Sequence, residues 1–322
     1  RKNYQNTIIK IKERWKLVVP WLVNIKENEG KMQGLVIENI SNLYKIQVNE
    51  YIYEAVARGK IKKEEISPVV GDIVEIEITD KENKKAVIEK IHSRNVYIKR
   101  PKMANLTQLI FVVSSKQPKP DLLLLDKQLA YANYLNVNAI IVLNKTDLDD
   151  KQEFEKIKNV YKKIGYKVLE TKAKEGNGIK ELIDIMQGNI NAFSGNSGVG
   201  KSTLINAIFK YSITEEGEIS RKNKRGKNTT TQVKLYKINE NTYIADTPGF
   251  STFEISEIES KDLYKYFKEF DNTNCKYIGC SHIKETECGI KQDVENEIID
   301  KGRYERFCKI YNELKQKEER KW

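Results

Sequence analysis

Short hydrophobic runs dominate the first third of this chain. From residue 32 to about 100, runs rich in Val, Ile and Tyr are separated by turn residues, as in β-strands. We expect strands at 35–37, 44–48, 51–56, 73–78 and 86–91. A turn at 68–72 predicts a tight entry into the fourth strand, with Gly71 supplying the backbone geometry and Asp72 a hydrogen bond. These strands predict a small OB-like barrel, with an SH3-like barrel as the alternative.

Strand-like runs alternate with helical periods between residues 105 and 255. The expected strands are 109–113, 139–143, 167–169, 190–193, 232–238 and 242–245, and the expected helices are 122–135, 151–164, 178–187 and 201–209. Repeated strand and helix units are typical of a mostly parallel, doubly wound sheet. After Gly249 the chain becomes mainly helical, with a last helix expected at 297–320.

The composition of the chain indicates which partners and which cellular compartment to expect. The 322 residues carry 57 Lys and Arg against 46 Asp and Glu, so a net charge of +11 favours a polyanionic partner such as nucleic acid. An AT-rich genome would produce the same abundance of Lys without that function. No apolar stretch reaches the roughly 20 residues of a membrane helix, and no secretion signal is recognisable. We therefore expect a cytoplasmic protein with no membrane association, whose Cys residues stay reduced.

A phosphate-binding loop lies between the expected strand at 190–193 and the expected helix from 201. Its glycines let backbone amides converge on phosphate oxygens, Lys201 neutralises the β and γ phosphates, and the Ser202 hydroxyl ligates Mg²⁺. The loop residues expected to bind the nucleotide are Gly195, Asn196, Ser197, Gly198, Val199, Gly200, Lys201, Ser202 and Thr203.

A guanine-reading motif, Asn144-Lys145-Thr146-Asp147, follows the apolar strand at 139–143. Ligands bind at the carboxyl ends of strands in such sheets. A buried Asp147 carboxylate can accept hydrogen bonds from N1 and N2 of guanine, and adenine has no such donor pair. With the phosphate loop, Asn144, Lys145 and Asp147 predict GTP as the nucleotide.

Two further segments predict nucleotide sensing. The motif Asp246-Thr247-Pro248-Gly249 follows the expected strand at 242–245; Asp246 would hold a water on Mg²⁺, and the Gly249 amide would donate to the γ-phosphate. In the polar segment 215–231, either Thr229 or Thr230 is the expected Mg²⁺-binding switch residue. The alternative for that segment is a solvated linker.

Cys275, Cys280, His282 and Cys288 offer three thiolates and an imidazole, a set that Zn²⁺ takes tetrahedrally. Four protein ligands leave no open position, so we expect one structural zinc rather than a catalytic one. Cys308 and His92 are expected to be ordinary packing residues.

The order of the nucleotide motifs is inverted. In an ordinary GTPase the phosphate loop comes first and the guanine motif last, whereas here the guanine motif precedes the loop. This order predicts a circularly permuted P-loop GTPase domain. The fold class is then multidomain α/β: an N-terminal extension of unknown role at 1–31, an OB-fold barrel at 32–100, the permuted GTPase domain at 101–256 and a helical zinc-binding domain at 257–322. We expect the natural start at Met32, with an amphipathic helix around 8–23 as the alternative.

These pieces resemble the RsgA (YjeQ) family of ribosome-associated GTPases. The matching segments are 68–72, 144–147, 195–203, 226–231, 246–249 and the four zinc ligands. The resemblance implies a GTPase that binds GTP and GDP, contacts rRNA through its barrel and zinc domain, assists late maturation of the small ribosomal subunit, and leaves on hydrolysis. We expect the protein to be a monomer.

Departures from that family concern catalysis. Asn228 replaces a His that the family usually has before the switch threonines, and Lys172 replaces a Ser beside the base, where the Ala173 amide can still bind the base oxygen. Lys201, Asn228, Thr230 and Gly249 are the residues expected to support hydrolysis. Asn cannot take a proton at neutral pH, so we expect slow turnover alone and stimulation by the subunit. The alternatives are a GTP-dependent RNA-binding clamp with negligible turnover and a permuted GTPase of large-subunit assembly.

Overall fold

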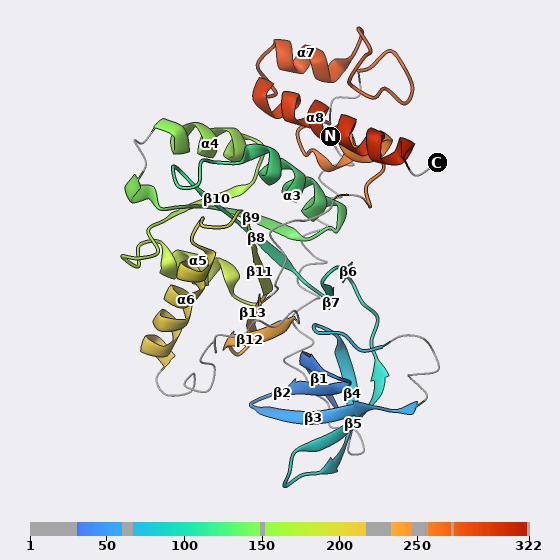
Figure 1. Ribbon diagram of the computed structural model, residues 1–322, viewed down its shortest axis with the longest axis vertical. Helices are drawn as coiled ribbons and strands as arrows, with labels where there is room; N and C mark the ends of the chain where they lie inside the picture. The colour runs from blue at the N-terminus through green and yellow to red at the C-terminus, as the bar shows by residue number, and fades with distance from the viewer. Residues whose placement is uncertain are drawn as a thin grey trace, which may run out of the picture. The chain divides into compact units, whose positions relative to one another are not determined.

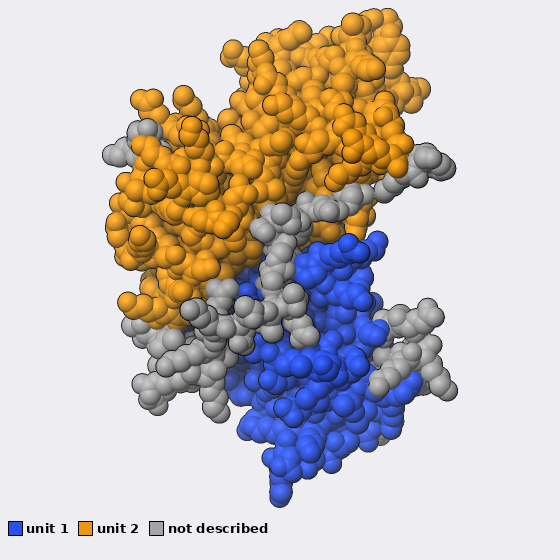
Figure 2. All heavy atoms as spheres, in the orientation of Figure 1, with its two compact units in different colours: residues 1–107, 183–192, 212–249 blue, residues 108–182, 193–211, 250–322 orange. Residues whose placement is uncertain are grey.

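The protein is described from a computed structural model, which covers residues 31–59, 67–148, 152–216, 233–246, 255, 257–271 and 274–320. It contains two compact units, which are described separately (Figure 2). Unit 1 comprises residues 1–107, 183–192 and 212–249, and unit 2 comprises residues 108–182, 193–211 and 250–322. None of the described helices is long and apolar enough to cross a membrane.

Unit 1 contains the barrel (Figure 1). Its strands are β1 Lys31–Ile40, β2 Leu43–Val48, β3 Tyr51–Ala57, β4 Ile73–Asp80 and β5 Lys85–Ile91. β1 pairs with both β2 and β4, β3 lies parallel to β5, and β4 pairs with β5, so the order 1-2-3-5-4 closes on itself. All five expected strands are confirmed, and the closure is that of an OB-like barrel rather than the SH3-like alternative.

The expected turn at 68–72 is also confirmed. Gly71 has a φ of +91°, and a Cβ there would lie 2.0 Å from the Ala104 carbonyl oxygen, so only glycine fits. The buried Asp72 carboxylate accepts a hydrogen bond from the Val69 amide at 2.7 Å. This closes the turn before β4 begins at Ile73.

Two hairpins complete unit 1. β6 Tyr97–Lys99 pairs with β7 Lys102–Ala104, and β12 Lys234–Asn239 pairs with β13 Thr242–Asp246. β11 Ile190–Ser194 runs parallel to β13. β12 also pairs antiparallel with barrel strand β1, where the Glu38 carboxylate binds Lys45 at 2.7 Å and Lys234 at 2.8 Å. The sequence did not predict this join between the barrel and the strand that follows the switch segment.

Unit 2 contains three parallel strands with helices on both faces. The strands are β8 Gln108–Ser114, β9 Asn138–Asn144 and β10 Lys167–Thr171, and the helices are α3 Leu122–Tyr134 and α4 Gln152–Lys163. Helices α5 Ile179–Met186 and α6 Lys201–Glu216 begin in unit 2 and end in unit 1. α3 and α4 lie on one side of the strands and α5 on the other (Figure 1). Every residue of β8 is buried, as expected for a strand covered on both faces.

The C-terminal part of unit 2 contains a 3₁₀ helix η4 Ser260–Tyr266, α7 Gly289–Glu295 and α8 Lys301–Glu319. The last helix begins at Lys301, later than the predicted residue 297. Glu297 has a left-handed φ of +56°, and the Asp300 carboxylate caps the helix by accepting a hydrogen bond from the Arg303 amide at 2.8 Å. α8 packs through Phe307 in a core that also contains Tyr131 of α3. The predicted domain boundaries remain a prediction.

Candidate nucleotide site and metal cluster

The phosphate loop links β11 to α6 and depends on two glycines. Gly195 has a φ of +138° and Gly200 a φ of +99°. A Cβ on Gly195 would lie 2.3 Å from the backbone carbonyl oxygen of Val112 in β8. A Cβ on Gly200 would lie 2.3 Å from the side-chain Nδ2 of Asn144, the last residue of β9. The loop therefore passes directly against the ends of two strands, where side chains other than hydrogen do not fit.

Lys201 opens helix α6 and turns its side chain back into this loop. Its Nζ donates hydrogen bonds to the carbonyl oxygens of Gly195 at 2.6 Å and Asn196 at 2.8 Å. Burial lowers the pKa of the Lys201 ammonium. Ser202 is exposed and Thr203 half-buried in the first helical turn. The cation thus lies at a helix N-terminus, where anions such as phosphate are favoured.

The guanine motif is attached to the phosphate loop by two side chains. Asn144 donates from Nδ2 to the Val199 carbonyl oxygen at 2.9 Å, and Lys145 donates from Nζ to the Gly198 carbonyl oxygen at 2.7 Å. Residues about 55 positions apart in the sequence are therefore held in one rigid group. These two hydrogen bonds fix the positions of segments 144–145 and 198–199 relative to each other.

Asn144 also holds a third loop. Its Oδ1 accepts a hydrogen bond from the Thr171 hydroxyl at 3.0 Å and a longer one from the Ala173 amide at 3.4 Å. Ala173 is buried, and the neighbouring Lys172 ammonium lies 3.7 Å from the Glu175 carboxylate. The Ala173 amide, expected to bind the base, thus already has a protein acceptor.

Asp147 lies in the short 3₁₀ helix η2 Thr146–Leu148, directly after the guanine motif's strand. The sequence predicted a buried carboxylate, and this is wrong, since Asp147 is exposed. The motif ends at the rim of the sheet, where the chain leaves β9 for the surface. The role of Asp147 in reading guanine remains a prediction.

The structure describes only some of the predicted catalytic and magnesium-binding residues. Asn228, Thr229, Thr230 and Gly249 fall outside the described residues. Asp246 is the last residue of β13, in unit 1, and is partly buried. Their roles toward Mg²⁺ and the γ-phosphate remain predictions.

The four predicted metal ligands converge in unit 2. The ligand atoms of Cys275, Cys280, His282 and Cys288 all lie within 4.8 Å of one another. The Cys275 sulfur is 3.9 Å from the Cys288 sulfur and 3.7 Å from His282 Nδ1, which is 3.3 Å from the Cys288 sulfur. Tetrahedral thiolates bound at about 2.3 Å are about 3.8 Å apart, so these donors fit one metal ion. Nδ1 is the ring nitrogen that faces the cluster.

The cluster's environment suits a metal. Burial lowers the pKa of His282, which favours the neutral imidazole that ligates metals. Glu285 stabilises the loop that carries His282 by accepting hydrogen bonds from the amides of Ser281 at 2.9 Å and Ile283 at 3.1 Å. Although burial opposes ionisation, these bonds lower the pKa of Glu285 to about 2.

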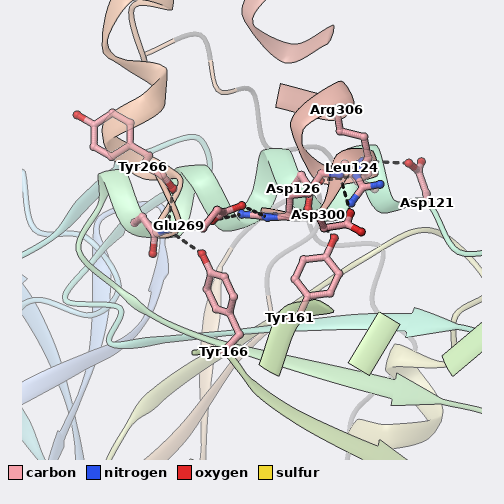
Figure 3. Close-up of polar contacts among 11 residues, drawn as sticks. Asp121, Leu124, Asp126, Tyr161, Tyr166, Tyr266, Glu269, Asp300 and Arg306 are labelled. Carbon is pink, nitrogen blue, oxygen red and sulfur yellow. Dashed lines mark hydrogen bonds and ion pairs between the residues drawn. The ribbon is translucent and has the colours of Figure 1, made fainter. Parts of the chain in front are cut away.

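An ion network joins α3 to α8, and no motif in the sequence indicated it (Figure 3). Asp126 of α3 accepts hydrogen bonds from Arg303, from Arg306 Nε at 2.5 Å and from the Tyr161 hydroxyl at 2.5 Å. Arg303 also binds the Glu269 carboxylate through Nε at 2.5 Å. The side chains of Asp126 and Arg303 are 0% and 1% exposed. The one feature of the sequence that could have indicated this network is a single Asp, Asp126, that follows four consecutive Leu residues in α3.

The same helix also contacts the phosphate loop. Gln128 of α3 donates to the hydroxyl of Ser194, the residue before the loop, at 2.8 Å. Asn196 donates to the Asp121 carboxylate at 3.2 Å, and Asp121 also caps α3 by accepting from the Leu124 amide at 2.9 Å. α3 is therefore the element that touches both the nucleotide loop and the C-terminal helix.

Comparison with known proteins gives a consistent result. The profile of the RsgA GTPase matches residues 91–256 and that of the RsgA N-terminal domain matches residues 33–88. The chain is 42% identical to the small ribosomal subunit biogenesis GTPase RsgA of Clostridium beijerinckii over 294 residues, covering 90% of this chain and 100% of the relative. It is 36% identical to the protein of that name from Alkaliphilus metalliredigens over 285 residues, covering 88% and 98%.

Two solved structures are similar over most of the chain. The crystal structure of YjeQ from Thermotoga maritima has a TM-score of 0.78 at 35% identity and covers 88% of this chain and 98% of its own. The structure of YloQ, a circularly permuted GTPase, has a TM-score of 0.76 at 28% identity and covers 91% and 98%.

Proposed function

Since the chain belongs to the RsgA GTPase family, we propose that it is a GTPase of small ribosomal subunit maturation, which binds the subunit with GTP and leaves after hydrolysis. We propose further that it acts in the cytoplasm as a monomer and contacts rRNA through its barrel and its C-terminal metal domain. The net charge of +11 supports a nucleic-acid partner.

The observation that carries the nucleotide assignment is the attachment of the guanine motif to the phosphate loop. Asn144 and Lys145 each donate to a carbonyl of that loop, at 2.9 Å and 2.7 Å. A base-reading loop and a phosphate-binding loop held at a constant separation are what a purine nucleoside triphosphate requires. The exposed Asp147 carboxylate, at the end of the base-reading motif, favours guanine over adenine.

Each predicted site residue would have a separate role in GTP hydrolysis. Lys201 would bind the β and γ phosphates, and the amides of 195–200 would bind their oxygens. Mg²⁺ would be held by Ser202, Asp246 and either Thr229 or Thr230, and when bound it neutralises phosphate charge. Asn228 can orient a water through hydrogen bonds without accepting its proton, and the Gly249 amide would donate to the γ-phosphate. This set supports slow turnover that increases when the subunit orders the switch residues.

We propose zinc as the metal of the cluster. Three thiolates and one imidazole at tetrahedral separations leave no position for water, which is typical of structural zinc. Its role would be to hold the loop 275–288 in one conformation, because the residues there form little regular structure.

Sedimentation and turnover test the proposal together. With a non-hydrolysable GTP analogue, the protein should pellet with purified small subunits and not with large subunits. GTP hydrolysis should increase at least tenfold when small subunits are added. Pelleting with large subunits would refute the small-subunit assignment, and equal rates with and without subunits would instead favour the GTP-dependent clamp.

A further inference from the structure

A cavity of about 670 Å³ lies in unit 1, between the β1–β2 turn of the barrel and the β6–β7 hairpin. Its volume is within the range of small-molecule and cofactor sites. Asn39 and Asn42 line it from the barrel, and Arg94, Tyr97 and Lys102 line it from the hairpin side. No Asp or Glu is among the described residues of its lining. The cavity is separate from the nucleotide site, whose phosphate and guanine loops lie in unit 2.

Tyr97 offers the cavity an aromatic face on a rigid support. Its side chain is 38% exposed, and the Arg94 guanidinium lies 4.8 Å from its ring centroid. Arg94 is itself fixed by two hydrogen bonds of 2.7 Å to the buried Asp72 carboxylate and one of 2.9 Å to the Ser67 carbonyl. Because Asp72 neutralises its charge, Arg94 serves mainly to hold the ring in place.

The positive charge at this cavity comes from the hairpin. Lys99, Arg100 and Lys102 are exposed, and no acidic residue occurs between positions 94 and 107. Lys102 lines the cavity, whereas the other two lie beside it on the same hairpin. The local field therefore favours an anion at the mouth of the cavity.

Two Asn side chains of the barrel also line the cavity. The side-chain oxygen of Asn39 is buried and has no hydrogen-bond partner among the described residues. A buried acceptor without a donor is unfavourable, so such groups usually mark a missing partner. Asn42 adds an exposed amide at the turn. Amides of this kind bind the donors and acceptors at the edge of a nucleobase.

We propose that this cavity binds a single unpaired nucleotide of RNA. The base stacks on Tyr97, its edge binds the amides of Asn39 and Asn42, and its phosphate lies near Lys102. A base stacked in a duplex offers neither a free face nor a free Watson–Crick edge, so the site selects single-stranded segments over duplexes. The inference rests on the proposed function for the source of the RNA, the small-subunit rRNA, and specifies the kind of segment bound.

Fluorescence anisotropy with the full-length protein tests this site. The probes are a fluorescein-labelled single-stranded RNA of twelve nucleotides and a duplex of the same length, each titrated at several salt concentrations. Tyr97→Ala should weaken single-strand binding roughly 5- to 150-fold, and Tyr97→Phe, which keeps the ring, should bind within about threefold of the wild type. Lys102→Ala should lower the salt slope of single-strand binding by about 0.7.

A matched control is available on the same barrel. Tyr51 is 55% exposed and lies 4.6 Å from the Lys84 ammonium, outside the cavity. Tyr51→Ala and Lys84→Ala should each change single-strand binding less than twofold. An equal loss of single-strand affinity in Tyr51→Ala and Tyr97→Ala would overturn the site, because it would show that any exposed aromatic side chain on the barrel contributes to RNA binding.

Cosedimentation with small subunits separates this inference from the proposed function. If wild-type protein binds subunits but its binding to single-stranded RNA does not depend on Tyr97, the nucleotide site is refuted and the function stands. If subunit binding depends on Tyr97 while no RNA binds, the cavity takes a protein segment, which also refutes it. If single-stranded RNA binds through Tyr97 but subunits do not pellet the protein, the proposed function fails and the site stands.

Discussion

Neutralising Asp126 should release helix α8 from helix α3. Asp126 accepts hydrogen bonds from two Arg side chains of α8 and from Tyr161, and two carboxylates balance the two guanidinium groups in this network. In Asp126→Asn the network keeps both cations and one carboxylate. Arg303 retains Glu269, but Arg306, 16% exposed, loses its only described carboxylate partner.

The expected loss follows from burial. Breaking a buried ion pair by removing one partner costs about 3–5 kcal/mol, because the remaining charge is left without compensation. Asn can still accept one hydrogen bond, and Arg306 reaches some solvent, so we expect the lower limit, about 3 kcal/mol. Since about 1.4 kcal/mol corresponds to a factor of ten, the opening equilibrium of α8 should rise roughly 100-fold.

Hydrogen exchange measured by mass spectrometry reports this opening directly. Peptides from Lys301–Glu319 should exchange roughly 100-fold faster in Asp126→Asn, while barrel peptides stay within about twofold of the wild type. The control is Lys127→Ala, which removes the 2.5 Å pair with Glu313 between the same two helices at the surface. An exposed pair contributes about 0–1 kcal/mol, so α8 exchange should rise no more than about fivefold. Equal exchange in the two variants would refute the reasoning.

Three other changes test the sites. Asp147→Asn should weaken GTP binding roughly 100-fold. The same variant should bind xanthosine triphosphate more tightly than the wild type does, because this base carries an acceptor where guanine carries a donor. Calorimetry with both nucleotides measures the two affinities. Glu285→Ala should lower zinc affinity about 10- to 100-fold, because the amides of Ser281 and Ile283 lose their acceptor. Competition with a chelating dye measures this affinity, and Glu285→Gln should retain part of it. Asn228→Ala should lower the rate of subunit-stimulated GTP hydrolysis about 10- to 100-fold and leave GTP affinity unchanged. An unchanged hydrolysis rate in single-turnover assays would exclude water positioning by Asn228.

The local features of this protein could be predicted from its sequence. Burial in β3 alternates every second residue, with Tyr53, Ala55 and Ala57 buried and Glu54 and Val56 exposed. Helix and strand periods are properties of neighbouring residues, so most of the expected elements lie within a few residues of their predicted positions; helix α6 instead continues from the predicted end at 209 to Glu216. The glycines of the phosphate loop and the spacing of the four metal ligands likewise express local chemistry, which the sequence carries without reference to the fold.

Contacts between distant segments were decided only by the tertiary structure. The closure of the barrel through β3 and β5, the pairing of β12 with β1 and the ion network around Asp126 join residues whose separation in the sequence predicts nothing about their distance. The same holds for the attachment of Asn144 to the phosphate loop and for the cavity beside Tyr97. Sequence periodicity determines what each segment becomes. Which segments meet depends on packing and hydrogen bonding summed over the whole chain, and that sum exists only once the chain has folded.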